Sequence, residues 1–91
     1  MKPIEVTLYT RQGCHLCEEA KQKMAPLLTE FGVTLREVDI DGEPALRAEY
    51  TNDVPVIFIA GRKAAKHGLD LRQFRRQLEA AQGAGPDPED S

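Results

Sequence analysis

The sequence predicts an α/β domain with the element order β-α-β-α-β-β-α, in which helices flank a four-stranded mixed sheet. Residues 4–8 alternate apolar and polar side chains, which is typical of a strand with one face on a core. From Leu16 to Phe31 the apolar residues are spaced by three and four, as in an amphipathic helix. Residues 56–60 form a continuous apolar run, which predicts a central strand covered on both faces.

The first half of the chain predicts a β-α-β unit. Residues 9–13 are expected to turn the chain towards the helix, and Gly32 is expected to end it. Pro26 removes one backbone hydrogen bond inside this helix and predicts a kink after about Lys23. Because the apolar stripe continues on both sides of the proline, we predict one bent helix. Residues 33–40 are rich in β-branched side chains and predict a second strand, parallel to the first.

The second half predicts two helices and two strands. Residues 41–44 are expected to open a short helix that ends near Asn52, since proline is tolerated in a first helical turn. After the apolar run, a weaker strand is predicted at residues 63–66. Asp70 and Gln73 then have the spacing of a capping box at the start of a last amphipathic helix.

Length and charge indicate one small domain without a strongly charged surface patch. The 91 residues suffice for a single core, and we predict a domain at 1–82 followed by a disordered acidic tail at 83–91. The net charge of −3 belongs to that tail, so the near-neutral body is not expected to bind nucleic acid or a membrane. No apolar run is long enough to span a bilayer, and the first residues lack the pattern of a secretory signal. We therefore expect a cytoplasmic protein.

A pair of cysteines carries the strongest chemical signal. Cys14 and Cys17 stand three positions apart at the start of the first helix, where two such side chains share a face and their sulfurs can form a disulfide. In a cytosolic chain, one close pair is more often catalytic or metal-binding than a structural staple. The helix start stabilises the thiolate that attacks a disulfide. We therefore predict Cys14 as the nucleophile and Cys17, one turn further in and more buried, as the resolving thiol.

Four further residues are candidate site residues. Arg11 and His15 could both favour the thiolate, and Arg11 is the better candidate because its charge does not depend on pH. His15 could equally be an exposed residue with little effect. Val54 and Pro55 precede the apolar strand, where the backbone of Val54 could pair with an extended thiol substrate.

These residues together resemble a glutaredoxin, and more specifically the small bacterial glutaredoxin-like proteins of the thioredoxin superfamily. The resemblance covers about residues 4–82 and is carried by three segments: Val6-Thr7-Leu8-Tyr9-Thr10-Arg11-Gln12-Gly13-Cys14-His15-Leu16-Cys17, Val54-Pro55 leading into Phe58 and Gly61, and Gly68-Leu69-Asp70-Leu71. It implies a thioredoxin-like fold, a cis bond before Pro55 and disulfide reduction through Cys14 and Cys17. It also implies that Val54 is the backbone partner of a glutathionyl group, with Asp70 near the free amino end of that group.

The sequence departs from the glutaredoxin pattern at three places. His15-Leu16 stands where Pro-Tyr is usual, and residues 65–68 replace a pair of glycines. Asp53 replaces the usual threonine and puts a carboxylate beside the expected place of a glutathione carboxylate. These departures weaken the expected glutathione site but leave the exchange chemistry intact.

The predicted function is therefore a thiol-disulfide oxidoreductase that reduces protein or low-molecular-weight disulfides. We expect a monomer without a tightly bound cofactor, reduced either by glutathione as a co-substrate or by a reductase. One alternative is metal or iron-sulfur cluster binding by Cys14, Cys17, His15 and His67, completed in a dimer or by added glutathione. The other is a non-enzymatic thioredoxin-fold module that holds a partner at Val54 and Pro55.

Overall fold

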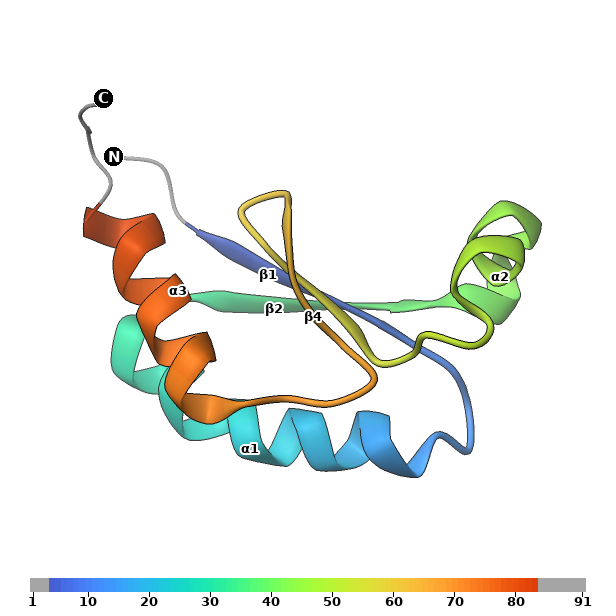
Figure 1. The fold of residues 1–91 in the computed structure, drawn as a ribbon, viewed down its shortest axis with the longest axis horizontal. Helices are drawn as coiled ribbons and strands as arrows, with labels where there is room; N and C mark the ends of the chain where they lie inside the picture. The colour runs from blue at the N-terminus through green and yellow to red at the C-terminus, as the bar shows by residue number, and fades with distance from the viewer. Residues whose placement is uncertain (1–3, 84–91) are drawn as a thin grey trace.

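The computed structural model describes residues 4–83 and shows a mixed sheet with helices on both of its faces (Figure 1). Its elements are, in chain order, β1 (Glu5–Thr10), α1 (His15–Phe31), β2 (Thr34–Asp39), the 3-10 helix η1 (Ile40–Gly42), α2 (Pro44–Tyr50), β3 (Val56–Ile59), β4 (Arg62–Lys66) and α3 (Leu71–Gly83). The strand order is β2-β1-β3-β4. β1 and β2 are parallel, whereas β3 is antiparallel to both of its neighbours. The predicted order of strands and helices is confirmed, with η1 as an addition.

The first strand is longer than its sequence pattern indicates. Tyr9 and Thr10, which we expected to begin a turn, pair with Val38 and Asp39 of β2. Tyr9 also pairs with Val56 of β3. The alternation of apolar and polar residues therefore ends before the strand does. The strand continues because the neighbouring strands on both sides supply backbone partners, which the sequence of one segment does not reveal.

The predicted single helix through Pro26 is confirmed, because α1 runs from His15 to Phe31 without interruption. Pro26 is exposed, whereas the opposite face of the helix is buried. Gly32 ends α1 in the left-handed conformation, with φ of +66°, and its N–H group bonds to carbonyl groups of the last turn. Glycine adopts this conformation without a steric penalty, as a helix C-terminal cap requires.

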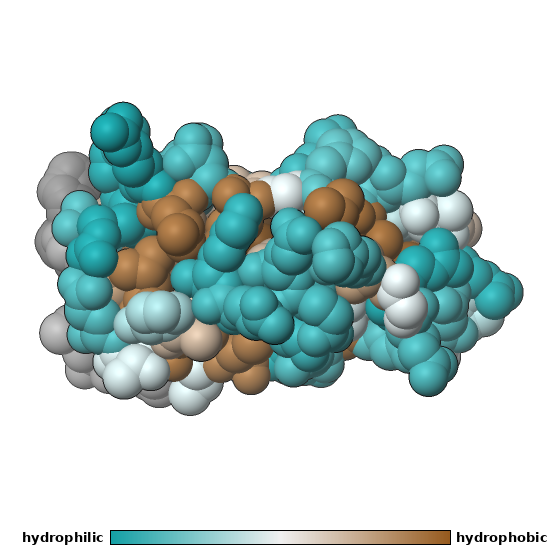
Figure 2. Space-filling view, turned by 90° about the horizontal axis from the view of Figure 1, so that it is seen from below, coloured by the Kyte–Doolittle hydropathy of each residue, from teal (hydrophilic) through white to brown (hydrophobic). Residues whose placement is uncertain are grey.

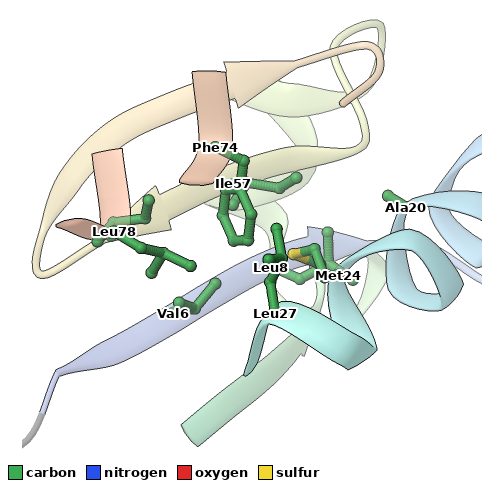
Figure 3. Packing of buried hydrophobic residues seen from close by; sticks show 9 residues of the cluster. Val6, Leu8, Ala20, Met24, Leu27, Ile57, Phe74 and Leu78 are labelled. Carbon is green, nitrogen blue, oxygen red and sulfur yellow. The ribbon is translucent and has the colours of Figure 1, made fainter. Parts of the chain in front are cut away.

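The main core lies between the sheet and two helices. Figure 3 shows side chains of β1 and β3 meeting those of α1 and α3. The fully packed members come from all four elements: Val6, Leu8, Ala20, Met24, Leu27, Ile57, Ile59, Phe74 and Leu78. A second, smaller cluster contains Ile40, Tyr50 and Val56 and includes residues that alternate along the strands with the main core. The short helix α2 thus covers the other face of the sheet at one end (Figure 1).

The last helix has the predicted N-terminal cap. The carboxylate of Asp70 accepts hydrogen bonds from the N–H groups of Arg72 and Gln73, at 3.0 and 3.4 Å. Further along, the guanidinium of Arg75 forms two hydrogen bonds, of 2.6 and 2.9 Å, with the carboxylate of Glu30 at the end of α1. Seen from the side of α1, the surface is largely hydrophilic, with apolar residues showing between polar ones (Figure 2).

Gly83 closes α3, so the last helix extends one residue into the segment that we predicted as a tail. The remainder of that predicted tail, residues 84–91, lies outside the described residues. Within residues 4–83, none of the helices has the length and apolar character that crossing a membrane would require.

Replacing Leu78 by alanine should lower the free energy of unfolding by about 2–5 kcal/mol, because its side chain is fully buried between α3 and the sheet. Urea unfolding followed by circular dichroism measures the loss. Leu71→Ala on the same helix is the control, since Leu71 is 40% exposed and should cost much less. Equal losses for the two variants would contradict the packing described above.

The bond between Arg75 and Glu30 predicts an acid-sensitive contribution to stability. The hydrogen bonds from Arg75 hold the pKa of Glu30 below its ordinary value. Their contribution is therefore present above the unfolded-state pKa of a glutamate, about 4.3, and is lost as the pH falls through the lower folded-state value. We expect Glu30→Gln to lower the urea midpoint at neutral pH, and the difference from the parent protein to vanish in acid. A difference that is independent of pH would contradict this ion pair.

Candidate functional site

Three loops meet at one end of the sheet. The pairing of Tyr9 with Val56 places the segment after β1 beside the segment before β3. Val56 also pairs with Lys66, so the residues that follow β4 lie at the same end. The topology thus brings together the cysteine pair, the Val54–Pro55 segment and His67, which are far apart in the sequence.

Cys14 is the N-terminal cap of α1 and forms a disulfide with Cys17. Its N–H group donates to the carbonyl of Arg11 at 3.2 Å, which holds the loop closed. Its Sγ accepts a hydrogen bond from the N–H group of Cys17 at 3.1 Å. Gly13, with φ of +79°, provides the left-handed backbone that leads into this cap.

The two sulfurs differ in their access to solvent. Cys17 is fully buried, whereas Cys14 is partly exposed. This difference follows from position: Cys17 is the first member of the buried stripe of α1, and Cys14 precedes the helix. The pair is therefore arranged as one accessible sulfur and one internal sulfur.

Arg11 is held by residues that lie far away in the sequence. Its guanidinium bonds to both carboxylate oxygens of Asp41, at 2.8 and 3.2 Å, and to the carbonyl oxygen of Thr51 at 3.3 Å. The side chain thus ties the loop before Cys14 to the turn after β2 and to the end of α2. Its charge is matched by a carboxylate. Sequence reasoning missed Asp41, because nothing local marks a partner 30 positions away.

His15 projects into solvent. Its side chain is 84% exposed, and Nε2 lies 2.8 Å from the carboxylate of Glu19 one helical turn later. The structure therefore agrees with the exposed alternative for His15. Leu16, the other residue between the cysteines, is also exposed.

The peptide bond between Val54 and Pro55 is cis, as the resemblance implies. Pro55 is buried, and Val54 is partly exposed. The N–H group of Val54 donates to the carbonyl of Tyr50 at 3.2 Å, and that of Asp53 donates to the same oxygen at 2.9 Å. The amide of Val54 is therefore not free to pair with an extended substrate, because it already bonds to a carbonyl group at the end of α2.

Asp53 and His67 form a unit that the sequence did not reveal. The N–H group of His67 donates to the carbonyl groups of Pro55 and Asp53, at 2.8 and 3.0 Å. Its Nε2 lies 3.6 Å from the carboxylate of Asp53. His67 has φ of +68°, a left-handed conformation that histidine adopts more readily than most residues. Both side chains are partly open to solvent.

An aromatic cluster supports this end of the sheet from the α2 side. The rings of Tyr9 and Tyr50 stack with centroids 5.0 Å apart, and Tyr9 meets Phe58 edge to face at 5.5 Å. Burial raises the pKa of Tyr50, with smaller contributions from Glu49, Tyr9 and Asp53. The ring of Tyr50 is thus held in the aromatic cluster, and the carbonyl group of the same residue accepts the amides of Asp53 and Val54.

The structure bears on two predicted ligand sites, the contact of Asp70 with a substrate amino group and a metal site. The carboxylate of Asp70 caps the first turn of α3 through Oδ1 alone, which leaves Oδ2 available to accept a bond from a substrate amino group. In the part of the chain that the structure describes, no group of three or more histidine, cysteine, aspartate or glutamate side chains is arranged to hold a metal ion.

Comparison with known proteins agrees with this geometry. Residues 5–79 match the family described as "Glutaredoxin-like domain (DUF836)". The "Glutaredoxin-like protein YDR286C homolog" of Dictyostelium discoideum is 34% identical over 84 residues, which cover 86% of this chain and 78% of that protein.

Solved structures show the same fold. The solution structure of protein Ne2328 from Nitrosomonas europaea has a TM-score of 0.75 and 30% identity, and covers 86% of this chain and 94% of its own. A chloroplastic thioredoxin z matches with a TM-score of 0.70 and 14% identity, over 89% of this chain and 80% of that one. At that identity the likeness shows the fold alone. The predicted thioredoxin-like α/β fold is confirmed.

Removing the charges of Arg11 and Asp41 singly and together should reveal a coupling of about 0.5–1 kcal/mol in the free energy of unfolding. The size is modest because both side chains are about one-third exposed. The cycle uses Arg11→Gln and Asp41→Asn in urea unfolding, at low and at high salt, and the coupling should shrink with salt. Asp39→Asn is the control: Asp39 forms no ion pair with Arg11 and should show a much smaller coupling to it. Equal couplings at Asp39 and Asp41 would contradict a specific tie.

Proposed function

The chain belongs to the glutaredoxin-like family, and from that membership we propose that it is a thiol-disulfide oxidoreductase that reduces disulfides through Cys14 and Cys17. The observation that carries the proposal is the arrangement of the two sulfurs. The pair is linked as a disulfide at the start of α1, with Cys14 partly exposed and Cys17 buried one turn behind it. An incoming disulfide can therefore reach the first sulfur but not the second.

The reaction consists of two successive thiol-disulfide exchanges. The thiolate of Cys14 attacks one sulfur of the substrate disulfide, forms a mixed disulfide and releases the other substrate sulfur as a thiolate. Cys17, after losing its proton, then attacks Sγ of Cys14 and releases the second substrate thiol. Two electrons and two protons pass to the substrate, and the Cys14–Cys17 disulfide forms. An external thiol, either glutathione or a dithiol reductase, returns the pair to its reduced state.

The helix start supplies the electrostatic assistance. The Sγ of Cys14 is placed to accept the N–H group of Cys17, one of the free donors in the first turn of α1. That bond and the positive end of the helix dipole favour negative charge on sulfur. Arg11 adds less than a free guanidinium would, because Asp41 matches its charge. We therefore assign thiolate stabilisation mainly to backbone groups, and the role of Arg11 mainly to holding the loop.

Iodoacetamide should label Cys14 of the reduced protein much faster than Cys17 at neutral pH, because Cys14 is both accessible and stabilised as a thiolate. Mass spectrometry of timed samples measures the two rates. The same protein in urea is the control, since unfolding should make the rates similar. Equal, slow labelling of both folded sites, together with an absence of disulfide reductase activity, would overturn the proposal.

Two serine variants separate the steps. Cys14→Ser should abolish disulfide reduction, whereas Cys17→Ser should accumulate a mixed disulfide on Cys14 that the parent protein resolves. If Cys14→Ser kept the cellular role of the protein, a non-enzymatic binding module would replace the enzyme.

The electron donor is identified by a separate comparison. Reduction of a glutathione mixed disulfide and of a protein disulfide is measured with glutathione reductase and with thioredoxin reductase as the electron source.

A further inference from the structure

Asp53 places a carboxylate next to the cis-proline segment, on a stretch of backbone that is held by several hydrogen bonds. Its N–H group bonds to the carbonyl of Tyr50 and its own carbonyl accepts from His67, at 2.9 and 3.0 Å. Tyr50 is buried in the smaller core cluster, so this backbone has a firm support. The carboxylate itself is partly open to solvent, with the side chain 31% exposed. A ligand that meets this carboxylate therefore does not have to order the backbone that carries it.

This carboxylate carries a charge that the protein leaves largely uncompensated. Within residues 4–83, no lysine or arginine forms an ion pair with Asp53; its neighbour is the imidazole of His67, which is neutral unless protonated. Arg11, the cation of the cysteine loop, is bound to Asp41. Two lysines lie on neighbouring residues: Lys66 precedes His67, and Nζ of Lys63 lies 5.8 Å from the centre of the Tyr50 ring, but neither forms an ion pair with Asp53.

Other acids at this end add to the negative potential. Glu19 is paired with His15, which also lacks a fixed charge, and Asp39 caps the backbone of Asp41 without an ion pair among the described residues. Lys21 is shared between Glu18 and Glu37. Among the described residues, Glu19 and Asp39 thus add negative charge at this end without a lysine or arginine partner, although the body of the chain is close to neutral.

We propose that Asp53 is a specificity-determining residue that favours disulfides with a cationic group beside the reacting sulfur and disfavours those with a carboxylate there. The inference rests on the proposed function, because it concerns the substrate of the same disulfide. A substrate sulfur that reaches Cys14 brings its flanking atoms to the end of the sheet where Val54 and Asp53 lie. A fixed surface charge steers the association of charged partners and changes its rate.

The test compares three small disulfides of similar size and different charge: those of cysteamine, of mercaptoethanol and of mercaptopropionate. The reduced protein is mixed with each, and the loss of free thiol gives a second-order rate constant without any electron donor. Because each probe has its own reactivity, the readout is the ratio of the rate for Asp53→Asn to the rate for the parent protein. Asparagine keeps the shape of the side chain and all of the backbone bonds.

For Asp53→Asn we expect the cationic probe to react about threefold to fivefold more slowly and the anionic probe to react faster by a similar factor. The neutral probe should change little. The effects should be largest at about 0.01 M salt and shrink at about 0.15 M, where the screening length falls from about 30 to about 8 Å. Glu79→Gln, which removes an exposed acid from α3, is the charge control and should leave all three rates unchanged.

A second control tests the neighbour of the carboxylate. His67→Asn removes the side chain beside Asp53 but no carboxylate, and asparagine tolerates the left-handed backbone at this position. It should scale the three rates by one common factor. If Asp53→Asn also scaled all three rates equally, or matched Glu79→Gln, the inference would be overturned while the reductase function stood. If the parent protein reacted with none of the probes, both would fall.

Discussion

The packing of α1 against the sheet is the constraint on which the rest of the site depends. Cys17, Ala20, Met24 and Leu27 are spaced by three and four and form one buried stripe of the helix. When Met24 and Leu27 enter the core between β1 and α3, Cys17 must enter with them. Cys14 lies just before the helix and stays partly exposed. The division of the pair into an accessible and a protected sulfur is therefore a by-product of core formation.

The second constraint is the way in which three loops hold one another at the end of the sheet. Arg11 connects the cysteine loop to Asp41 and Thr51, and the carbonyl of Tyr50 receives the amides of Asp53 and Val54. His67 closes the arrangement by donating to Pro55 and Asp53. These bonds use polar groups that could otherwise meet a substrate. The carboxylate of Asp53 stays partly open to solvent at this end of the sheet.

The sequence allowed most elements to be located because their signals are local. Alternation in residues 4–8, the stripe in α1, the left-handed Gly32 and the Asp70 cap each depend on neighbours within one or two turns. The extra length of β1 was not predictable, since Tyr9 and Thr10 are in a strand only because β2 and β3 pair with them. The same limit applies to Arg11: its charge suggested a role at the thiolate, but its partners came from distant turns.

By itself the sequence located the groups that can carry chemistry and indicated the fold class: two cysteines one helical turn apart, a proline at the entrance of a central strand, and a pattern of apolar residues typical of an α/β domain. The tertiary structure alone decided the surroundings of that chemistry. It paired Asp53 with His67, engaged the amide of Val54 and matched the charge of Arg11. The physical reason is that bonding patterns within a helix or strand repeat along the chain, whereas contacts between loops depend on how the strands are ordered and in what register they pair.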